Sequence, residues 1–257
     1  MRGFPCWRLK RFPISLRKRY ARLLAQNRQH AAIAQSVEHL PCNQEAKGST
    51  PFCGPMSKIK ELLTMRDILT PARLLLVVDM QNDFIDGALA NPAAQKIVTP
   101  IADFIRTWEG DIAFTMDGHS RSTYAKTEEG KRIPPHCFAF EHGSAINSEI
   151  MHAATESKND CVFLDKATFG FPEFADNDSL LAMDEIDLNE YCKEVVICGT
   201  CTDICVLTNA LLLRTGYPSM KITVDASLCA GTTPEKHKMA LELMRGCAID
   251  VINDEEG

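Results

Sequence analysis

The chain has 257 residues, of which 45% are hydrophobic and 24% charged, and its formal net charge is −6. These values are ordinary for a globular protein with a sizeable core. The longest apolar runs, such as residues 74–78, are far too short to span a bilayer. We therefore expect neither a membrane partner nor a nucleic-acid partner.

Cysteine usage indicates the redox compartment. The eleven cysteines are odd in number, and Cys161, Cys192 and Cys198 lie in apolar, strand-like contexts. In such contexts cysteine behaves as a small core residue. We therefore expect mostly reduced thiols and a cytoplasmic protein.

Residues 1–55 differ in charge from the remainder of the chain, because they carry ten Lys or Arg and only two acidic residues. A basic arm of this kind fits a targeting peptide in part. The strings AQSVEH (residues 34–39) and GSTP (residues 48–51) also resemble the translated D and T arms of a tRNA gene. We expect residues 1–55 to be a disordered, over-extended reading frame without function and residues 56–257 to form one domain. N-terminal sequencing of the native protein tests this expectation.

From residue 73 onward, apolar runs alternate with helical patterns. Strands are predicted at residues 73–79, 112–116, 161–165, 194–198, 220–224 and 248–252. Helices are predicted at residues 92–108, 178–191, 202–215 and 234–246. This alternation is typical of βαβ units and predicts an α/β fold with a parallel sheet. The polar residues 120–150 are expected to be loop-rich, and a loop region of that length is usually functional.

Three chemically useful side chains follow predicted strands. Asp79 ends the first strand, Lys166 follows the third, and Cys205 lies just beyond the fourth. The carboxyl ends of parallel strands meet at one edge of the sheet, where such folds bind ligands. There the carboxylate can accept a thiol proton, and the ammonium group can hold the carboxylate. Cys205 also lies in the first turn of a predicted helix, where thiolate is favoured over thiol. The pattern predicts a cysteine nucleophile.

Each of these residues also has a plainer interpretation. An aspartate that closes a strand often caps a helix, Lys166 alone would be a surface charge, and Cys205 alone would be a core thiol. Cys198 and Cys201 form a C-x-x-C pair that resembles a redox motif. However, Cys198 lies within the predicted strand and should be buried, which disfavours redox chemistry. The shared placement of the three residues favours the nucleophile.

A second constellation suits a metal ion. Asp117 and His119 follow the second predicted strand, and His136 returns from the long loop. Two imidazoles and a carboxylate can bind a catalytic divalent metal and leave positions open to water or substrate. Histidines with an ordinary structural role in the loop are the alternative, and His142 and His152 are competing ligands in less closely spaced contexts.

Several motifs together resemble one known family. VVDMQNDF (residues 77–84), DKATFGF (165–171) and GTCTDICV (199–206) are similar to the isochorismatase-like cysteine hydrolases. DGH (117–119) and PPHC (134–137) are similar to the nicotinamidase branch of that family. The resemblance covers about residues 70–252 and implies a three-layer αβα sandwich with a six-stranded parallel sheet.

The resemblance also implies how the site would work. Asp79, Lys166 and Cys205 would form a triad that hydrolyses nicotinamide to nicotinate and ammonia through a cysteine acyl-enzyme. A cis peptide at Thr200–Cys201 would aim the N–H groups of Cys201 and Cys205 at an oxyanion. No organic cofactor is implied.

Metal-containing members of the family would bind the ion, expected to be zinc, through positions that match Asp117, His119 and His136. The ion would hold the pyridine nitrogen of nicotinamide. Flat aromatic substrates would be enclosed by three phenylalanines that are also candidate core residues, Phe84, Phe138 and Phe169.

Some residues depart from the family pattern and leave other substrates open. Gly118 replaces a frequent tryptophan, and the residues around Phe140 and the pair Thr200–Cys201 also differ. Related enzymes cleave N-carbamoyl compounds, maleamate or biuret, often without a metal. Isochorismatases proper lack the cysteine, so Cys205 argues against them. A non-catalytic binding protein on the same fold is a further alternative, and we expect a homo-oligomer.

Overall fold

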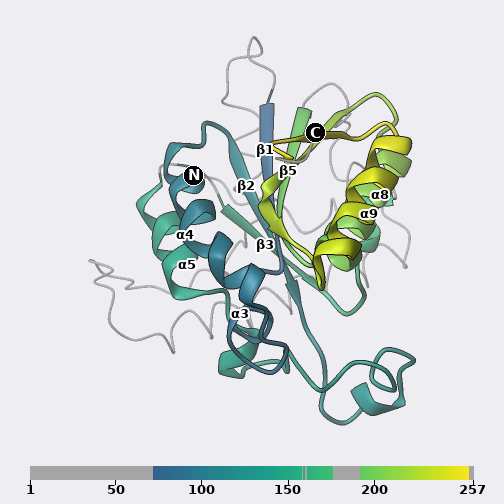
Figure 1. Ribbon diagram of the computed structural model, residues 1–257. Helices are drawn as coiled ribbons and strands as arrows, with labels where there is room; N and C mark the ends of the chain where they lie inside the picture. The colour runs from purple at the N-terminus through teal and green to yellow at the C-terminus, as the bar shows by residue number, and fades with distance from the viewer. Residues whose placement is uncertain (1–71, 158, 160, 176–191, 255–257) are drawn as a thin grey trace, which may run out of the picture. The chain divides into compact units, whose positions relative to one another are not determined.

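A parallel sheet of six strands is central to the computed structural model, which describes residues 72–157, 159, 161–175 and 192–254 (Figure 1). The strands are β1 (Ala72–Val78), β2 (Asp111–Asp117), β3 (Cys161–Lys166), β4 (Cys192–Thr200), β5 (Lys221–Ala230) and β6 (Asp250–Ile252). Their order across the sheet is β3-β2-β1-β4-β5-β6. The predicted six-stranded parallel sheet is confirmed. The predicted extension at residues 1–55 and the predicted helix at 178–191 lie outside the described residues.

Helices cover both faces of the sheet. They are α3 (Asn82–Ile85), α4 (Pro92–Thr107), α5 (Ser148–Glu156), α8 (Leu207–Gly216) and α9 (Pro234–Gly246), with short 3-10 turns η2 (Tyr124–Lys126), η3 (His142–Ser144) and η4 (Pro172–Ala175) and a π-type turn η5 (Thr202–Val206). Leu75 and Val77 of β1 belong to the core under α4 and α5, whereas Leu76 and Val78 belong to the core under α8 and α9 (Figure 1). Burial on both faces explains the unbroken apolar run of β1. The three-layer sandwich is confirmed.

Local sequence signals explain where several elements begin and end. The Asn91 side chain accepts a hydrogen bond from Ala93 N, and Pro92 occupies the first turn of α4. Helices α4 and α9 match the predictions closely. Helix α5 was not predicted, and β5 runs six residues beyond its predicted end at residue 224. The buried Asp225 does not interrupt β5 because it accepts hydrogen bonds from Ser227 and Asn253. In the described ranges no helix combines the length and apolarity needed to cross a membrane.

The strand order places a switch point at the centre of the sheet. β1 and β4 are neighbours, and from this pair the chain winds outward in opposite directions. In open α/β sheets, ligands bind outside the carboxyl ends of the strands at such a point. Asp79 directly follows β1, and the turn that carries Cys205 follows β4. The topology therefore brings two predicted catalytic residues to the position where this fold binds ligands.

Gly199 allows β1 and β4 to approach each other near this switch point. Its φ is +119°, and a Cβ at this position would lie 2.1 Å from the main-chain oxygen of Val78. Backbone atoms cannot yield as a flexible side chain can. The position therefore requires glycine both for its backbone conformation and for its packing.

Replacing this residue should be costly. We expect Gly199→Ala to lower the free energy of unfolding by about 3 kcal/mol, because both a left-handed backbone and a clash with Val78 must be accommodated. The matched control is Gly246→Ala at the end of α9, where an added Cβ has no neighbour within 4 Å. The control should change stability by about 1 kcal/mol or less. Urea denaturation of both variants measures the difference, and equal stabilities would contradict the assignment.

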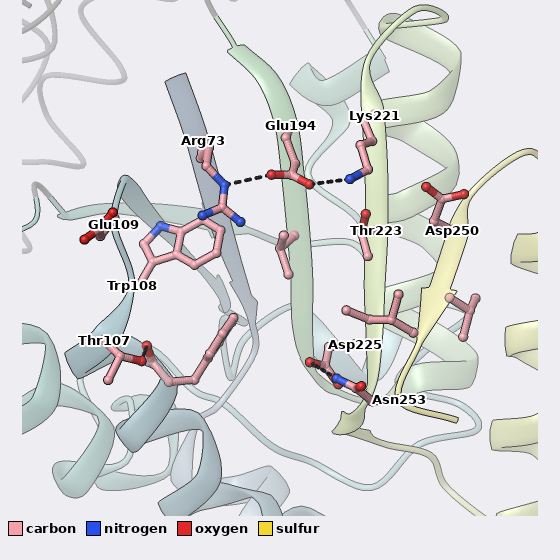
Figure 2. Close-up of a pocket in the computed structure, with 14 residues that line it drawn as sticks. Arg73, Thr107, Trp108, Glu109, Glu194, Lys221, Thr223, Asp225, Asp250 and Asn253 are labelled. Atoms are coloured by element: carbon pink, nitrogen blue, oxygen red, sulfur yellow. Dashed lines mark hydrogen bonds and ion pairs between the residues drawn. The ribbon is translucent and has the colours of Figure 1, made fainter. Parts of the chain in front are cut away.

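A cavity of about 720 Å³ lies beside the end of α4, near the amino-terminal ends of β1, β4 and β5 (Figure 2). Charged side chains from neighbouring strands pair across it. Glu194 binds Arg73 at 2.7 Å and Lys221 at 2.8 Å, and the Arg73 guanidinium stacks on the Trp108 ring. Because these ion pairs are partly exposed, they contribute little to stability. The cavity lies away from the carboxyl ends of β1 and β4, where Asp79 and Cys205 are found.

Candidate active site

Lys166 connects the other two residues of the predicted triad. Its Nζ lies 2.7 Å from Asp79 Oδ2 and 3.8 Å from Cys205 Sγ. The same atom lies 3.6 Å from Asp117 Oδ1 in the predicted metal site. The side chains of Lys166 and Asp79 have no exposed surface. The three strand-end residues therefore meet in one buried, charged cluster.

Thr115 belongs to this cluster and was missed by sequence reasoning. It lies on β2, beside β1, and is fully buried. Its hydroxyl donates a hydrogen bond of 2.6 Å to Asp79 Oδ1, the oxygen that does not face Lys166. Both carboxylate oxygens of Asp79 are thus held in place. A threonine inside an apolar strand gives no sequence signal for this role, because threonine is common in strands.

Burial governs the protonation of the triad. It raises the pKa of the Cys205 thiol well above its usual value, and the Asp79 carboxylate adds to this effect while Lys166 opposes it. Burial also raises the pKa of Asp79 against the opposing charge of Lys166. The prediction that helix position favours a Cys205 thiolate is therefore wrong for the resting site. The structure favours a thiol beside a carboxylate that can accept its proton.

The turn that carries Cys205 follows β4 directly. The peptide bond between Thr200 and Cys201 is cis, as the resemblance implies. The main-chain oxygen of Cys201 then accepts hydrogen bonds from Ile204 N at 3.0 Å and Val206 N at 3.1 Å. These bonds close the π-type turn η5 before α8 begins. Use of the Cys201 and Cys205 N–H groups as an oxyanion hole stays a prediction.

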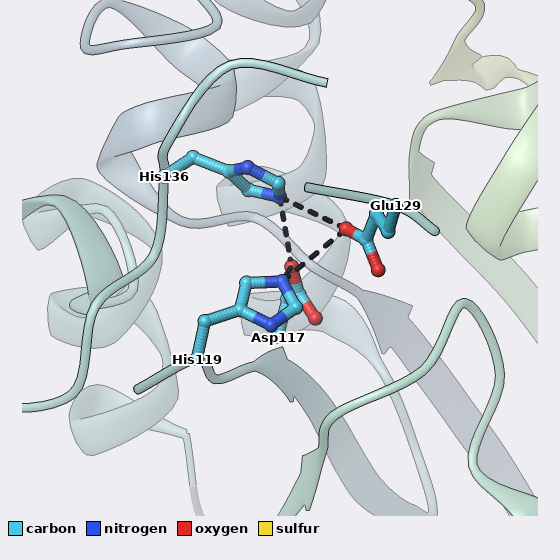
Figure 3. A group of neighbouring side chains, drawn as sticks. All are labelled: Asp117, His119, Glu129 and His136. Atoms are coloured by element: carbon cyan, nitrogen blue, oxygen red, sulfur yellow. Dashed lines mark hydrogen bonds and ion pairs between the residues drawn. The ribbon is translucent and has the colours of Figure 1, made fainter. Parts of the chain in front are cut away.

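The three predicted metal ligands converge, and a fourth residue joins them (Figure 3). One ligand atom from each of Asp117, His119, Glu129 and His136 lies within 4.8 Å of the others. Asp117 Oδ2 is 2.9 Å from His119 Nε2 and 3.0 Å from His136 Nε2. Sequence reasoning missed Glu129, whose Oε1 lies 3.3 Å from His119 Nε2. Two imidazoles and two carboxylates form a donor set that suits a divalent cation.

The histidine contacts support this fit. His136 Nδ1 lies 2.8 Å from the Pro134 carbonyl oxygen and 3.2 Å from the Tyr124 hydroxyl. Since the carbonyl can only accept, it fixes the proton on Nδ1 and leaves a lone pair on Nε2 facing the cluster. Buried His119 Nε2 has no hydrogen-bond partner of suitable geometry. A bound cation would give His119 Nε2 the partner that it lacks.

The residues after Asp79 hold the metal-site segments. Gln81 receives a hydrogen bond from Asp117 N at 2.7 Å and donates one to Asp117 O at 2.8 Å. Asp83 accepts a bond of 2.7 Å from Cys137 N, next to His136. The motif that begins with the triad carboxylate thus also positions two of the predicted ligands.

The predicted pocket phenylalanines occupy different environments. Phe84 packs edge-on against His136 with ring centroids 5.3 Å apart, and Phe138 packs edge-on against Tyr124 at 5.9 Å. Both are largely buried, whereas Phe169, in the segment after Lys166, is 40% exposed. Phe84 therefore packs directly on a metal-site histidine, whereas Phe138 packs on Tyr124, whose ring contacts both histidines. Their contact with substrate stays a prediction.

The remaining candidates lie apart from the cluster. His142 contacts Asn82, and His152 is an exposed partner of Glu156. Neither is among the four converging residues. Cys198 is fully buried, as predicted, and burial raises the pKa of Cys201 to about 11. These environments disfavour a redox pair at C-x-x-C.

Comparison with known proteins places this geometry in a family. A family model described as the isochorismatase domain matches residues 73–256. The chain belongs to the isochorismatase family. The match includes the strands and all residues of the triad and of the four-residue cluster.

Relatives refine this placement. The nicotinamidase of Saccharomyces cerevisiae is 28% identical over 222 aligned positions, which cover 70% of this chain and 99% of the yeast protein. The pyrazinamidase/nicotinamidase of Streptococcus mutans has a TM-score of 0.59 and 27% identity, covering 70% of this chain and 100% of that one. The pyrazinamidase of Pyrococcus horikoshii, solved in complex with zinc, has a TM-score of 0.57 and 27% identity, with coverages of 71% and 99%. This isochorismatase-family chain falls on the nicotinamidase branch and is an amidohydrolase.

Proposed function

We propose that this amidohydrolase converts nicotinamide to nicotinate and ammonia through a cysteine acyl-enzyme. The observation that carries the proposal is the position of Lys166 Nζ, within 2.7 Å of Asp79, 3.8 Å of Cys205 and 3.6 Å of Asp117. One ammonium group thereby links a thiol and its base to a cluster of metal-binding type. The relatives named nicotinamidase and pyrazinamidase support the choice of substrate.

The proposed reaction begins with transfer of the Cys205 thiol proton to Asp79 while Lys166 stays charged. The sulfur attacks the carboxamide carbon, and the N–H groups of Cys201 and Cys205 stabilise the resulting oxyanion. Asp79 then gives its proton to the amide nitrogen, the C–N bond breaks, and ammonia leaves a thioester. Water attacks the thioester as Asp79 takes its proton. Nicotinate is released, and the thiol regains that proton.

The raised pKa of Asp79 fits this double role. A carboxyl group with a raised pKa is both a better base for the thiol and an acid able to protonate the leaving nitrogen. Thr115 and Lys166 hold its two oxygens, so the group does not rotate away between the two transfers. Lys166 also faces the sulfur and can stabilise the thiolate when it forms.

Asp117, His119, Glu129 and His136 would hold a divalent metal, which we propose is zinc. When bound, the ion would offer open coordination positions to the ring nitrogen of the substrate and to water. We further propose that an aromatic ring of the substrate is enclosed by the side chains of Phe84, Phe138 and Phe169.

Ammonia release tests the proposal. The full chain should release ammonia from nicotinamide, lose that activity when dialysed against a chelator, and regain it when zinc is added. Activity that resists the chelator would remove the metal from the proposal and favour the metal-independent amidases. If nicotinamide is not cleaved but N-carbamoyl compounds, maleamate or biuret are, the substrate assignment is wrong.

The state of the cysteines bears on the cellular compartment of the enzyme. Every cysteine in the described ranges is a free thiol, including the exposed Cys247. We therefore propose a reducing compartment, the cytoplasm.

We also propose a homo-oligomer, which light scattering of the purified chain would measure.

A further inference from the structure

The turn that carries Cys205 is hydrogen-bonded to a segment distant in sequence. Two consecutive residues at the start of η5 bind the connection between β5 and α9 and the first turns of α9. Asp203 Oδ1 accepts a hydrogen bond of 2.7 Å from Thr232 N, and Asp203 Oδ2 accepts one of 2.5 Å from the Thr232 hydroxyl. This pairing holds the outer side of the turn, where Thr232 is exposed.

The second contact of the turn joins a buried threonine to a partly buried histidine. Thr202 has no exposed surface, and its Oγ1 lies 2.9 Å from His237 Nδ1 on α9. His237 is held by its own main-chain bond to Thr233 O at 2.9 Å. Gly231 packs so closely that an added Cβ would lie 2.7 Å from His237 Cβ. The imidazole therefore presents a fixed hydrogen-bond partner to the first residue of the turn.

The opposite side of the turn is anchored by another buried side chain. Asn209 donates a hydrogen bond of 2.8 Å to the main-chain oxygen of Cys205 and accepts one of 2.8 Å from Phe171 N. Cys205 thus lies between two fixed points, Asn209 on one side and the Thr202–His237 pair on the other. Releasing either point would let the sulfur shift relative to Lys166. Small displacements of reacting groups lower rates strongly.

We propose that His237 is a positioning residue of this hydrolase, which acts through Thr202 to fix the turn that carries the Cys205 sulfur. His237 does not touch the reacting atoms in this assignment. The inference rests on the proposed role of Cys205 as nucleophile, but it does not depend on the identity of the amide or on the metal.

Substitutions at the two partners test the coupling. His237→Ala and the nearly isosteric Thr202→Val should each lower kcat by about 10-fold with little change in KM, because placement rather than substrate binding is lost. The double variant should be no slower than either single variant, because both remove the same contact. His237→Asn should restore most of the rate, since an amide can reach the position of Nδ1. His152→Ala, which removes an exposed histidine on α5, is the matched control and should leave the rate unchanged.

A second measurement separates this inference from the proposed reaction. The rate of Cys205 alkylation by iodoacetamide needs no amide substrate and should fall by about 10-fold in His237→Ala and Thr202→Val, but not in His237→Asn. If the wild-type chain cleaves no amide while this pattern of alkylation holds, the substrate is wrong and the positioning role stands. Losses that multiply in the double variant, or alkylation rates equal to wild type, would overturn the role of His237. Circular dichroism of each variant confirms that it is folded, and Thr202→Ser, which keeps the hydroxyl, should retain activity if Thr202→Val unfolds.

Discussion

Cys205→Ala should lower amide hydrolysis by about 10,000-fold or more, because the variant cannot form the thioester on which the proposed reaction depends. The reason for so large an effect is structural. Lys166 contacts both Asp79 and the Cys205 sulfur, and the proposed reaction uses that sulfur to accept the acyl group. Ammonia release under single-turnover conditions measures the loss, and mass spectrometry of the quenched wild-type enzyme should show a covalent adduct absent from the variant.

Cys247→Ala is the control for this experiment. Cys247 is an exposed free thiol at the end of α9 and takes no part in the cluster. Its removal should leave the rate unchanged, which excludes a general effect of thiol loss. A Cys205→Ala variant that retains more than about one hundredth of the wild-type rate would show that water attacks the amide directly and that the thiol is not the nucleophile.

The catalytic residues at strand ends could be predicted from the sequence, because the hydrophobic pattern locates the strands and a parallel sheet places their carboxyl ends at one edge. Asp79 and Cys205 lie on either side of the switch point, and Lys166 lies at the end of β3. The parallel order then brings all three to one edge without any knowledge of side-chain contacts. What sequence could not supply was the degree of burial around the sulfur. Position at a helix N-terminus alone would lower the pKa of the Cys205 thiol, but burial raises it.

Residues held by loops or by distant elements were not predictable in the same way. Thr115 and His237 act through a neighbouring strand and a later helix, and their roles depend on tertiary contacts alone. Glu129 lies in an acidic pair with Glu128 within a loop that has no regular period. Nothing in the sequence says which of the two turns inward. In the structure the side chain of Glu129 is 14% exposed and faces two histidines, whereas that of Glu128 is 68% exposed.

The second large prediction concerns zinc binding by the cluster of Asp117, His119, Glu129 and His136. His136→Ala should weaken zinc binding by about 100-fold or more, because even the loss of an outer-shell contact to a ligand can cost that much. Glu129→Gln should weaken binding by about 10-fold, since it keeps the shape of the side chain and removes one of the two carboxylates in the cluster. Competition with a chelating dye measures both affinities without requiring catalytic activity. Ammonia release should fall in parallel when zinc is limiting.

Glu128→Gln is the matched control, because it makes the same chemical change one residue away. Glu128 pairs with Lys131 and Arg132 on the surface and does not face the cluster. Its zinc affinity should equal that of the wild-type chain. If Glu128→Gln and Glu129→Gln weaken binding equally, the effect is one of overall charge and Glu129 is no ligand. If His136→Ala binds zinc as tightly as wild type, the ion is bound elsewhere, and the two imidazoles that converge on Asp117 serve the reaction only by hydrogen bonding.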